Sequence, residues 1–414
     1  MFELDPAFIR PAYDGCCFTA IPQSIAGLLG HGQIALAPEL FRGLPKTYRS
    51  VVLVLLDGFG WRFFEKVADD YPALRRFAAA DGVVKLTAQF PSTTAAHVTC
   101  LHTGLEVGQS GVYEWQYYEP QLDTLITPLL FSYAGTKERD QLKATGIDPR
   151  RLYPTATIYQ QLVQHGIASV VFQHREYTPS TFSDIAFDGA KTFGYNTLPE
   201  ALVNLRQLLA EQRKPTYYVL YFDRLDALCH EYGPNTPQVA AELDAFLTTL
   251  ERQFLAQLGG GCGDTLVLLT ADHGQSETHP LRTIYLNTHP SFAGCERFLR
   301  TDRQGKPIVP AGSPRDFFLY IRDELLEEAY DFLARRLAGR AVVYRTADLI
   351  AAGFFGAAPV SQAFLGRVGN LVVLPYRGEA VWWYEQGRFE QKYFGHHGGL
   401  TPQEMEIPLL AWAT

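Results

Sequence analysis

Four short runs of apolar, β-forming residues constrain the fold of this chain more than any other feature of its sequence. None of them alternates with polar residues, which is typical of a strand buried on both faces of a parallel sheet. Helical patterns lie between the runs, for example at residues 198–212 and 236–258. Strands that alternate with helices predict an α/β fold, here a three-layer α/β/α sandwich around a mostly parallel sheet. The apolar runs occupy residues 51–56, 169–173, 217–222 and 265–270.

The segment from about residue 290 to 385 differs in character from the rest of the chain. It begins with turn-forming residues, continues with the helical pattern DELLEEAYDFLARRLAG, and ends with NLVVLPYRGEAVWWYEQG. The last stretch is typical of a hairpin. We therefore predict a core formed by residues 1–290 and 385–414, with a smaller cap inserted at about 290–385.

Composition and charge exclude several classes of protein. The chain has 36 Lys and Arg against 44 Asp and Glu, a formal charge of −8, which is not the basic footprint of a nucleic-acid-binding protein. No apolar run reaches the roughly 18 residues that a membrane helix needs. The first residues, MFELDPAFIRPAYDG, lack the basic and apolar regions of a secretory signal. We expect a cytoplasmic protein with reduced cysteines and no nucleic-acid or membrane partner; the oligomeric state stays open.

Acidic and imidazole side chains follow the predicted strands. The carboxyl ends of parallel strands meet at one edge of a sheet, which is where such sheets bind ligands. Mixed carboxylate and imidazole ligands suit zinc, with manganese or iron as alternatives, and their number suits two metal sites. Singly, each of these residues is more simply explained by a turn or a polar surface. The candidates are Asp57, Asp226, His230, Asp272, His273 and His397, with Asp223 and His396 as rivals of Asp226 and His397.

A candidate nucleophile lies in the stretch FPSTTAAHVTCLHTG, residues 90–104. A proline followed by three hydroxyl residues and a helical pattern indicates a loop that enters a helix. The simplest interpretation is that Ser92, Thr93 or Thr94 caps this helix. The functional interpretation is that one hydroxyl attacks a phosphate-like group held at the helix N-terminus. Such a hydroxyl needs a base or a metal to lower its pKa.

These motifs, taken together and in this order, resemble the alkaline phosphatase superfamily, and within it the nucleotide pyrophosphatase/phosphodiesterase branch. The resemblance extends from about residue 50 to the C-terminus, apart from the predicted cap. It includes DGFG, FPSTTAAH…TG, DALCHEYGP with Cys229 in the place of a glycine, ADHG, and HGG before LTPQEMEIPLL.

The resemblance implies two divalent metal ions, expected to be zinc, and a set of ligands for each. Asp226, His230 and His397 would hold the first ion. The second would be held by the remaining three, Asp57, Asp272 and His273, with Thr94 as its exchangeable ligand. Thr94 would then be the nucleophile of a hydrolase that cleaves phosphodiester or pyrophosphate bonds of small, nucleotide-like substrates through a phospho-threonine.

The sequence departs from the family pattern after the nucleophile helix. The branch usually has an asparagine there, whereas this chain reads GVYEWQYYEP with Glu114 or Trp115 at the expected place. We expect Tyr113, Glu114 and Trp115 to bind substrate. An aromatic wall against the leaving group and a set of core residues under the cap are equally compatible with the tyrosines of this stretch.

Other functions fit the sequence less well. A phosphomonoesterase is the main rival, and a comparison of monoester and diester turnover separates the two. A phosphoglycerate-mutase-like isomerase uses a serine and needs a large domain after the nucleophile, for which this chain has little room. A sulfatase is disfavoured because no cysteine lies in the sequence context that such enzymes modify. A non-catalytic metal-binding relative is a further alternative, and a dinucleotide-binding protein would have a G-x-G-x-x-G motif after a strand.

Overall fold

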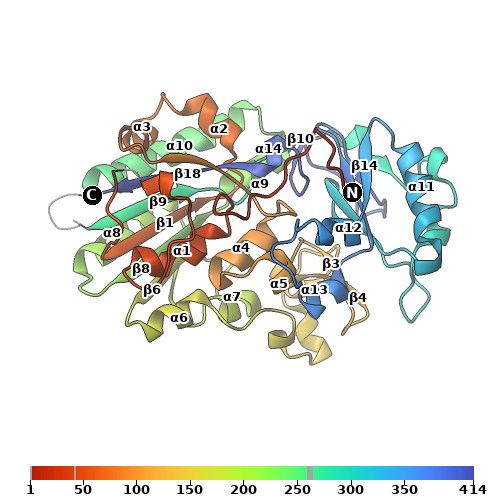
Figure 1. Ribbon diagram of the computed structural model, residues 1–414, viewed down its shortest axis with the longest axis horizontal. Helices are drawn as coiled ribbons and strands as arrows, with labels where there is room; N and C mark the ends of the chain where they lie inside the picture. Colours follow the sequence, from red (N-terminus) through yellow and green to blue (C-terminus); the bar gives the residue numbers. More distant parts are fainter. Residues whose placement is uncertain (1, 42, 259–263) are drawn as a thin grey trace.

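The computed structural model describes residues 2–41, 43–258 and 264–414. Its centre is a seven-stranded sheet in the order β2-β18-β9-β1-β8-β6-β7 (Figure 1). β1, β6, β7, β8 and β9 are parallel, and β18 is antiparallel to both of its neighbours. The predicted mostly parallel sheet is therefore confirmed. Its strands are β1 (Ser50–Leu56), β2 (Val83–Thr87), β6 (Ala168–His174), β7 (Lys191–Tyr195), β8 (Thr216–Phe222), β9 (Thr265–Thr270) and β18 (Glu406–Ala413).

The four apolar runs form β1, β6, β8 and β9, as the sequence predicts. Every residue of β1 and β9 is buried, because each of these strands lies between two others and both faces of the sheet are covered by helices. In the sheet Leu53 is aligned with Val219 on one side and Leu268 on the other. This register brings the carboxyl ends of the three central strands to one edge.

Helices cover both faces of this sheet (Figure 1). α2, α3, α9 and α10 pack on one side, where α3 and α10 contact each other. α1, α4, α6 and α7 pack on the other side around α4. The α-helices are α1 (Ala20–Leu28), α2 (Trp61–Val67), α3 (Pro72–Ala79), α4 (Thr94–Thr103), α5 (Val107–Ser110), α6 (Ile158–Gln164), α7 (Thr181–Ala186), α8 (Leu198–Glu211), α9 (Arg224–Tyr232), α10 (Pro237–Gln253), α11 (Leu326–Arg336), α12 (Thr346–Ala351), α13 (Gln362–Arg367) and α14 (Pro402–Met405).

The predicted cap segment contains a second sheet, in the order β12-β13-β15-β14, which lies with α11 at the far end of the molecule from the central sheet (Figure 1). Its residues share a hydrophobic cluster with residues that follow α4, so Tyr113 packs against Phe318. The strands outside the central sheet are β3 (Tyr117–Glu119), β4 (Thr124–Thr127), β5 (Ser132–Tyr133), β10 (Ser276–Glu277), β11 (Ile284–Tyr285), β12 (Ala311–Ser313), β13 (Asp316–Leu319), β14 (Ala341–Arg345), β15 (Leu371–Pro375), β16 (Val381–Trp382) and β17 (Gly395–His396).

The predicted hairpin at residues 370–387 is wrong. β15 pairs with β13 and β14, whereas β16 pairs in parallel with β11. All five residues of β15 are buried, which is typical of a strand with a partner on each side, and both partners come from distant segments. Among the described residues, no helix is long and apolar enough to span a membrane.

Candidate metal and phosphoryl-transfer site

The candidate metal ligands meet at the carboxyl-end edge of the central sheet. Asp57 directly follows β1, and Asp226 lies in the first turn of α9, which follows β8. Asp272 and His273 come two and three residues after Thr270, the last residue of β9. His397 follows β17, which pairs with β10 just after His273. Four segments that are far apart in the sequence thus converge at one place.

Asp57, Asp272 and His273 form one compact group. One ligand atom of each lies within 4.8 Å of the other two. His273 Nε2 is 3.4 Å from Asp57 Oδ1 and 3.5 Å from Asp272 Oδ2. All three side chains are buried. These are the residues that the family resemblance gives to the second ion.

Asp226, His273 and His397 form a second compact group with the same 4.8 Å limit. His397 Nε2 lies 3.7 Å from Asp226 Oδ1, and the rings of His273 and His397 stack with centroids 3.6 Å apart. His230, the remaining predicted ligand of the first ion, is outside this group but places Nε2 3.3 Å from Asp226 Oδ2. The six predicted acid and imidazole ligands therefore form one cluster in space. How they are divided between two ions stays a prediction.

The three histidines are oriented in the same way. Nδ1 of each ring lies against a main-chain carbonyl oxygen: Gly395 for His230, Gly274 for His273 and Ser92 for His397, at 2.7, 3.0 and 3.0 Å. A carbonyl oxygen only accepts hydrogen bonds, so Nδ1 must carry the proton. Nε2 of each ring is left with its lone pair directed at the carboxylates, which is how metal-binding histidines are commonly arranged.

The site is electrostatically unfavourable as the side chains stand. Asp57 Oδ1 and Asp272 Oδ2 are buried and have no hydrogen-bond donor. Burial, together with the charges of Asp272 and Asp226, raises the pKa of Asp57 well above its usual value. Burial also lowers the pKa of His273 to about 4 and of His397 to about 3, so both rings are neutral at pH 7.

Carboxylate oxygens and imidazole lone pairs therefore face one another at close range. A divalent ion removes this conflict, because it accepts lone pairs from both kinds of ligand and favours the ionised carboxylates. The donor set fits such an ion.

The geometry distinguishes the three candidate hydroxyls. Thr94 Oγ1 lies 3.1 Å from His273 Nε2 and 3.5 Å from Asp57 Oδ2, at the first residue of α4. Ser92 Oγ instead donates to Gly399 O at 2.8 Å. Thr93 occupies the N-cap position, yet its side chain makes no capping hydrogen bond. Only the Thr94 hydroxyl of the three contacts the acid and imidazole cluster.

The two rival ligands have other surroundings. Asp223 accepts a hydrogen bond from the Tyr177 hydroxyl and belongs to neither compact group. His396 lies in β17, adjacent to the site, with its ring centroid 5.1 Å from that of His230. Neither appears among the metal-competent groups of the residues that the structure describes.

Sequence reasoning missed two side chains that hold the ligands. The Tyr221 hydroxyl donates to Asp57 Oδ2, and the Gln275 side-chain amide donates to Asp226 Oδ1. In the sequence Tyr221 is part of the apolar run that forms β8, and nothing distinguishes it from the other tyrosines of that run.

The turn after β1 requires a glycine. Gly58 has a left-handed backbone with φ of +74°, and an added Cβ would lie 3.2 Å from Asp226 Cβ. A glycine is needed at that turn because the two ligand loops touch.

The residues expected to bind substrate differ in their exposure. Tyr113 is fully buried, stacks on Tyr117 with centroids 5.0 Å apart, and belongs to the hydrophobic core, which is the second of the two interpretations of this aromatic stretch. Glu114 is buried beside Thr93. Trp115 is 43% exposed and is the one member of this set that is free to meet a ligand from solvent.

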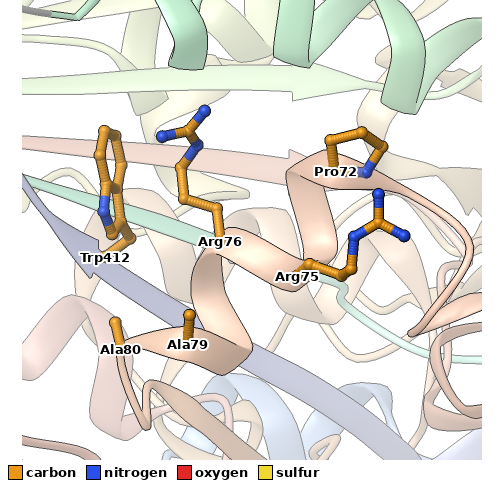
Figure 2. Close-up of a pocket in the computed structure, with 6 residues that line it drawn as sticks. All are labelled: Pro72, Arg75, Arg76, Ala79, Ala80 and Trp412. Carbon is orange, nitrogen blue, oxygen red and sulfur yellow. The ribbon is translucent and has the colours of Figure 1, made fainter.

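A surface pocket elsewhere on the molecule has different chemistry (Figure 2). It lies between α3 and β18, where the Arg76 guanidinium covers the Trp412 ring at 5.0 Å. No acid or imidazole lines it, so it offers none of the metal ligands found at the strand ends. Its lining residues are Pro72, Arg75, Arg76, Ala79, Ala80 and Trp412.

Comparisons with known proteins agree with this fold. No curated protein matches the sequence. Murine ectonucleotide pyrophosphatase/phosphodiesterase 5 is similar in structure, with a TM-score of 0.61 and 19% identity over 88% of each chain. An inactive threonine-to-alanine variant of that protein in complex with AMP gives the same TM-score and identity over 87% of each chain.

Phosphonoacetate hydrolase from Sinorhizobium meliloti 1021, in complex with phosphonoacetate, is equally similar. Its TM-score is 0.62 at 18% identity, over 88% of this chain and 90% of that one. At such identities these likenesses show the fold. The family model "Type I phosphodiesterase / nucleotide pyrophosphatase" matches residues 51–400, which is most of the chain. The protein therefore belongs to this phosphoester hydrolase family, within the alkaline phosphatase superfamily.

Proposed function

We propose that the protein is a two-metal hydrolase that cleaves phosphodiester or pyrophosphate bonds of small, nucleotide-like substrates with Thr94 as its nucleophile. The observation that carries this proposal is the position of Thr94 Oγ1, 3.1 Å from His273 Nε2 at the edge of the buried carboxylate and imidazole cluster. A general acid and base in a metal-free enzyme need only one or two such groups. The number of carboxylate oxygens and imidazole nitrogens whose lone pairs converge here instead suits bound cations.

Asp226, His230 and His397 would hold one ion, and Asp57, Asp272 and His273 the other. Zinc suits this mixture of nitrogen and oxygen ligands, with manganese or iron as alternatives. Bound divalent ions would lower the pKa of an attacking hydroxyl or water and neutralise charge on the phosphoryl oxygens.

The chain's own residues then perform two displacements at phosphorus. In the first, Thr94 loses its hydroxyl proton and its Oγ1 forms the bond to phosphorus. The leaving oxygen departs in line with the electron pair of the broken bond and takes up a proton. In the second, a water oxygen replaces Thr94 Oγ1 on phosphorus, and Thr94 regains a proton. The first turn of α4 presents main-chain N–H groups at this point, where a helix favours negative charge.

The choice of substrate class rests on the family and on what its relatives bind. One structural relative is an ectonucleotide pyrophosphatase/phosphodiesterase with AMP bound to an inactive threonine-to-alanine variant. Another hydrolyses a phosphonate and was solved with phosphonoacetate. Diesters and nucleotides are therefore the first substrates to test, with phosphonoacetate and a phosphomonoester as rivals.

The test is turnover of a substrate panel by protein purified without chelator, with metal content measured on the same sample. The panel contains bis(p-nitrophenyl) phosphate, p-nitrophenyl phosphate, a dinucleotide pyrophosphate and phosphonoacetate. We expect the diester or pyrophosphate to be fastest. Much faster turnover of the monoester or the phosphonate would overturn the substrate class.

Thr94→Ala should abolish turnover and leave the metal-binding residues in place. Thr99 provides a matched control in the same helix, since its hydroxyl donates to Ala95 O at 2.7 Å and faces away from the cluster. Thr99→Ala should therefore retain activity. Full turnover in Thr94→Ala would remove Thr94 from the nucleophile role and leave Thr93 or Ser92.

A further inference from the structure

A pair of buried carboxyl groups lies next to the nucleophile loop and outside the metal-competent groups of the described residues. Glu114 lies between α5 and β3, and Asp316 is the first residue of β13. Glu114 is 1% exposed and Asp316 is fully buried. No lysine or arginine forms an ion pair with either of them in the part of the chain that the structure describes.

Counting hydrogen bonds shows that this pair needs a proton. Asp316 Oδ1 accepts from the Ser313 main-chain N–H at 3.0 Å, and one oxygen of Glu114 accepts from the main-chain N–H of Trp115. The other two oxygens, Glu114 Oε1 and Asp316 Oδ2, are buried and have no donor. The two carboxyl groups interact directly through their side chains, and each changes the pKa of the other. Two carboxylates only accept, so a hydrogen bond between them requires that one is protonated.

The local environment favours retention of that proton. Burial raises the pKa of Glu114 to about 7. Burial, followed by the charge of Glu114, raises the pKa of Asp316 well above its usual value. Two like charges in one buried place make the first deprotonation of such a pair easy and the second difficult.

The pair links the two loops that form the proposed reaction centre. On one side the Thr93 side chain lies close enough to Glu114 to lower the pKa of that carboxyl group, and Thr93 directly precedes Thr94. On the other side Ser313 Oγ lies 2.5 Å from Asp316 Oδ1 and 3.0 Å from His397 O.

The loop that carries His397 is also in direct contact with Asp316. A Cβ added to Gly398 would lie only 2.4 Å from Asp316 Oδ1. Because His397 Nδ1 donates to Ser92 O at 3.0 Å, the contacts close into a ring around the Thr94 turn.

We propose that Glu114 and Asp316 share a single proton and that this pair positions the Thr93–Thr94 turn against the His397 loop. The proton supplies the donor that joins the two carboxyl groups, and it leaves one negative charge instead of two beside a site for anionic substrates. The inference rests on the proposed function for its kinetic consequence. A nucleophile displaced by about 1 Å costs on the order of 100-fold in rate, so loss of the link should be visible in kcat.

The experiment compares isosteric and truncated variants at both positions. In Glu114→Gln the amide N–H replaces the shared proton as donor to Asp316, and the amide oxygen still accepts from Trp115. Asp316→Asn repeats this substitution from the other side. We expect kcat of both to lie well above that of the corresponding alanine variants, because the donor between the two side chains is kept. Glu114→Ala and Asp316→Ala should lose about 100-fold in kcat with unchanged metal content and little change in KM.

A second measurement detects the proton itself and needs no turnover. The infrared difference spectrum between the wild type and Glu114→Gln near neutral pH should contain the C=O stretch of a buried protonated carboxyl group, because the subtraction cancels the carboxyl groups of the metal-competent cluster, which both proteins share. Glu119→Gln is the matched control, because Glu119 is equally buried but ionised against Arg367, 2.7 Å away. The difference spectrum between the wild type and that variant should lack the band.

The outcomes separate this inference from the proposed function. A wild type without activity on any phosphorus ester would overturn the proposed function and leave the infrared test standing. Full activity in Glu114→Ala, or a Glu114→Gln as slow as Glu114→Ala, would overturn the positioning role. An infrared band that is unchanged in both Glu114→Gln and Asp316→Asn would overturn the shared proton. This test does not use the alanine variants, so it still applies if those variants do not fold.

Discussion

Asp272→Asn should have opposite effects on the metal-free and the metal-bound protein. Asp272 Oδ1 accepts hydrogen bonds from the main-chain N–H groups of Gly58 and His273 at 3.1 and 2.9 Å, and an asparagine oxygen would accept both. The other side-chain atom, Oδ2, faces His273 and has no donor. The substitution therefore keeps the shape of the loop. It replaces a lone pair by two N–H groups at the point where an ion would bind.

The size of the effect follows from the distances in the cluster. Ligand atoms of Asp57 and Asp272 lie within 4.8 Å of each other. At an effective dielectric constant of about 20, two unit charges at that separation repel by about 3 kcal/mol. Burial already raises the pKa of both acids, so protonation relieves part of this repulsion. Removing one charge should therefore stabilise the metal-free protein by about 1–3 kcal/mol, which is a rise of a few degrees in Tm for a chain of this length.

The assay is thermal unfolding of chelator-treated protein with and without added zinc, together with metal content. In the wild type, zinc at about 100 times its Kd should add about 2.7 kcal/mol, and Asp272→Asn should show none of this response. Asp223→Asn is the matched control, since Asp223 follows β8 at the same edge but accepts from Tyr177. A variant that binds zinc like the wild type, or whose metal-free form is less stable, would refute the argument.

Three further predictions concern side chains around the cluster. Tyr221→Phe removes the donor to Asp57 and should weaken zinc binding by about 10- to 100-fold in a competition titration; a change below two-fold would contradict this role. The folded state raises the pKa of Glu114 from 4.5 to about 7, so it binds the proton more tightly than the unfolded chain does. Stability of the metal-free protein should thus fall as pH rises from about 4.5 to about 7, and Tm in Glu114→Gln should fall less over this range. Trp115→Ala should raise KM for substrates with an aromatic leaving group and leave Tm unchanged, because this side chain is 43% exposed.

The central strands were predictable because their burial is complete. β1 and β9 have neighbours on both edges and helices on both faces, so their inner positions are all apolar and the run is visible in the sequence; only the end positions Ser50, Thr265 and Thr270 carry a hydroxyl. β7 lies at the edge of the sheet with Lys191 and Thr192 exposed, and it carries no such pattern. The failed hairpin at residues 370–387 has the same origin. A short apolar run indicates a strand but not which distant strand pairs with it.

The candidate metal ligands were visible in the sequence for a related reason. Asp57 and Asp272 each follow a recognisable strand. The carboxyl ends of parallel strands lie at the same edge of the sheet, so the two residues can be placed near each other without knowledge of the other contacts. Tyr221 and Asp316 were not visible, because their contribution depends on which residue faces them in space. Asp316 lies in the predicted cap and reaches the site only through the packing of β12 and β13, which pair as Ser313 with Asp316. Such contacts are set by tertiary structure, and no spacing in the sequence indicates them.

The proposed shared proton suggests how this chain could function without the asparagine that the branch usually has in this segment, where Glu114 or Trp115 stands instead. An asparagine amide is a neutral hydrogen-bond donor, whereas a glutamate at the same place would bring a negative charge towards an anionic substrate. A glutamate that shares a proton with Asp316 avoids this second charge, and its contacts run to Thr93 and Trp115. The segment at about residues 290–385 thus supplies Asp316 to the nucleophile loop. If that view is right, Asp316→Ala should slow turnover more than Trp115→Ala does, although Asp316 is far from the nucleophile in sequence and fully buried.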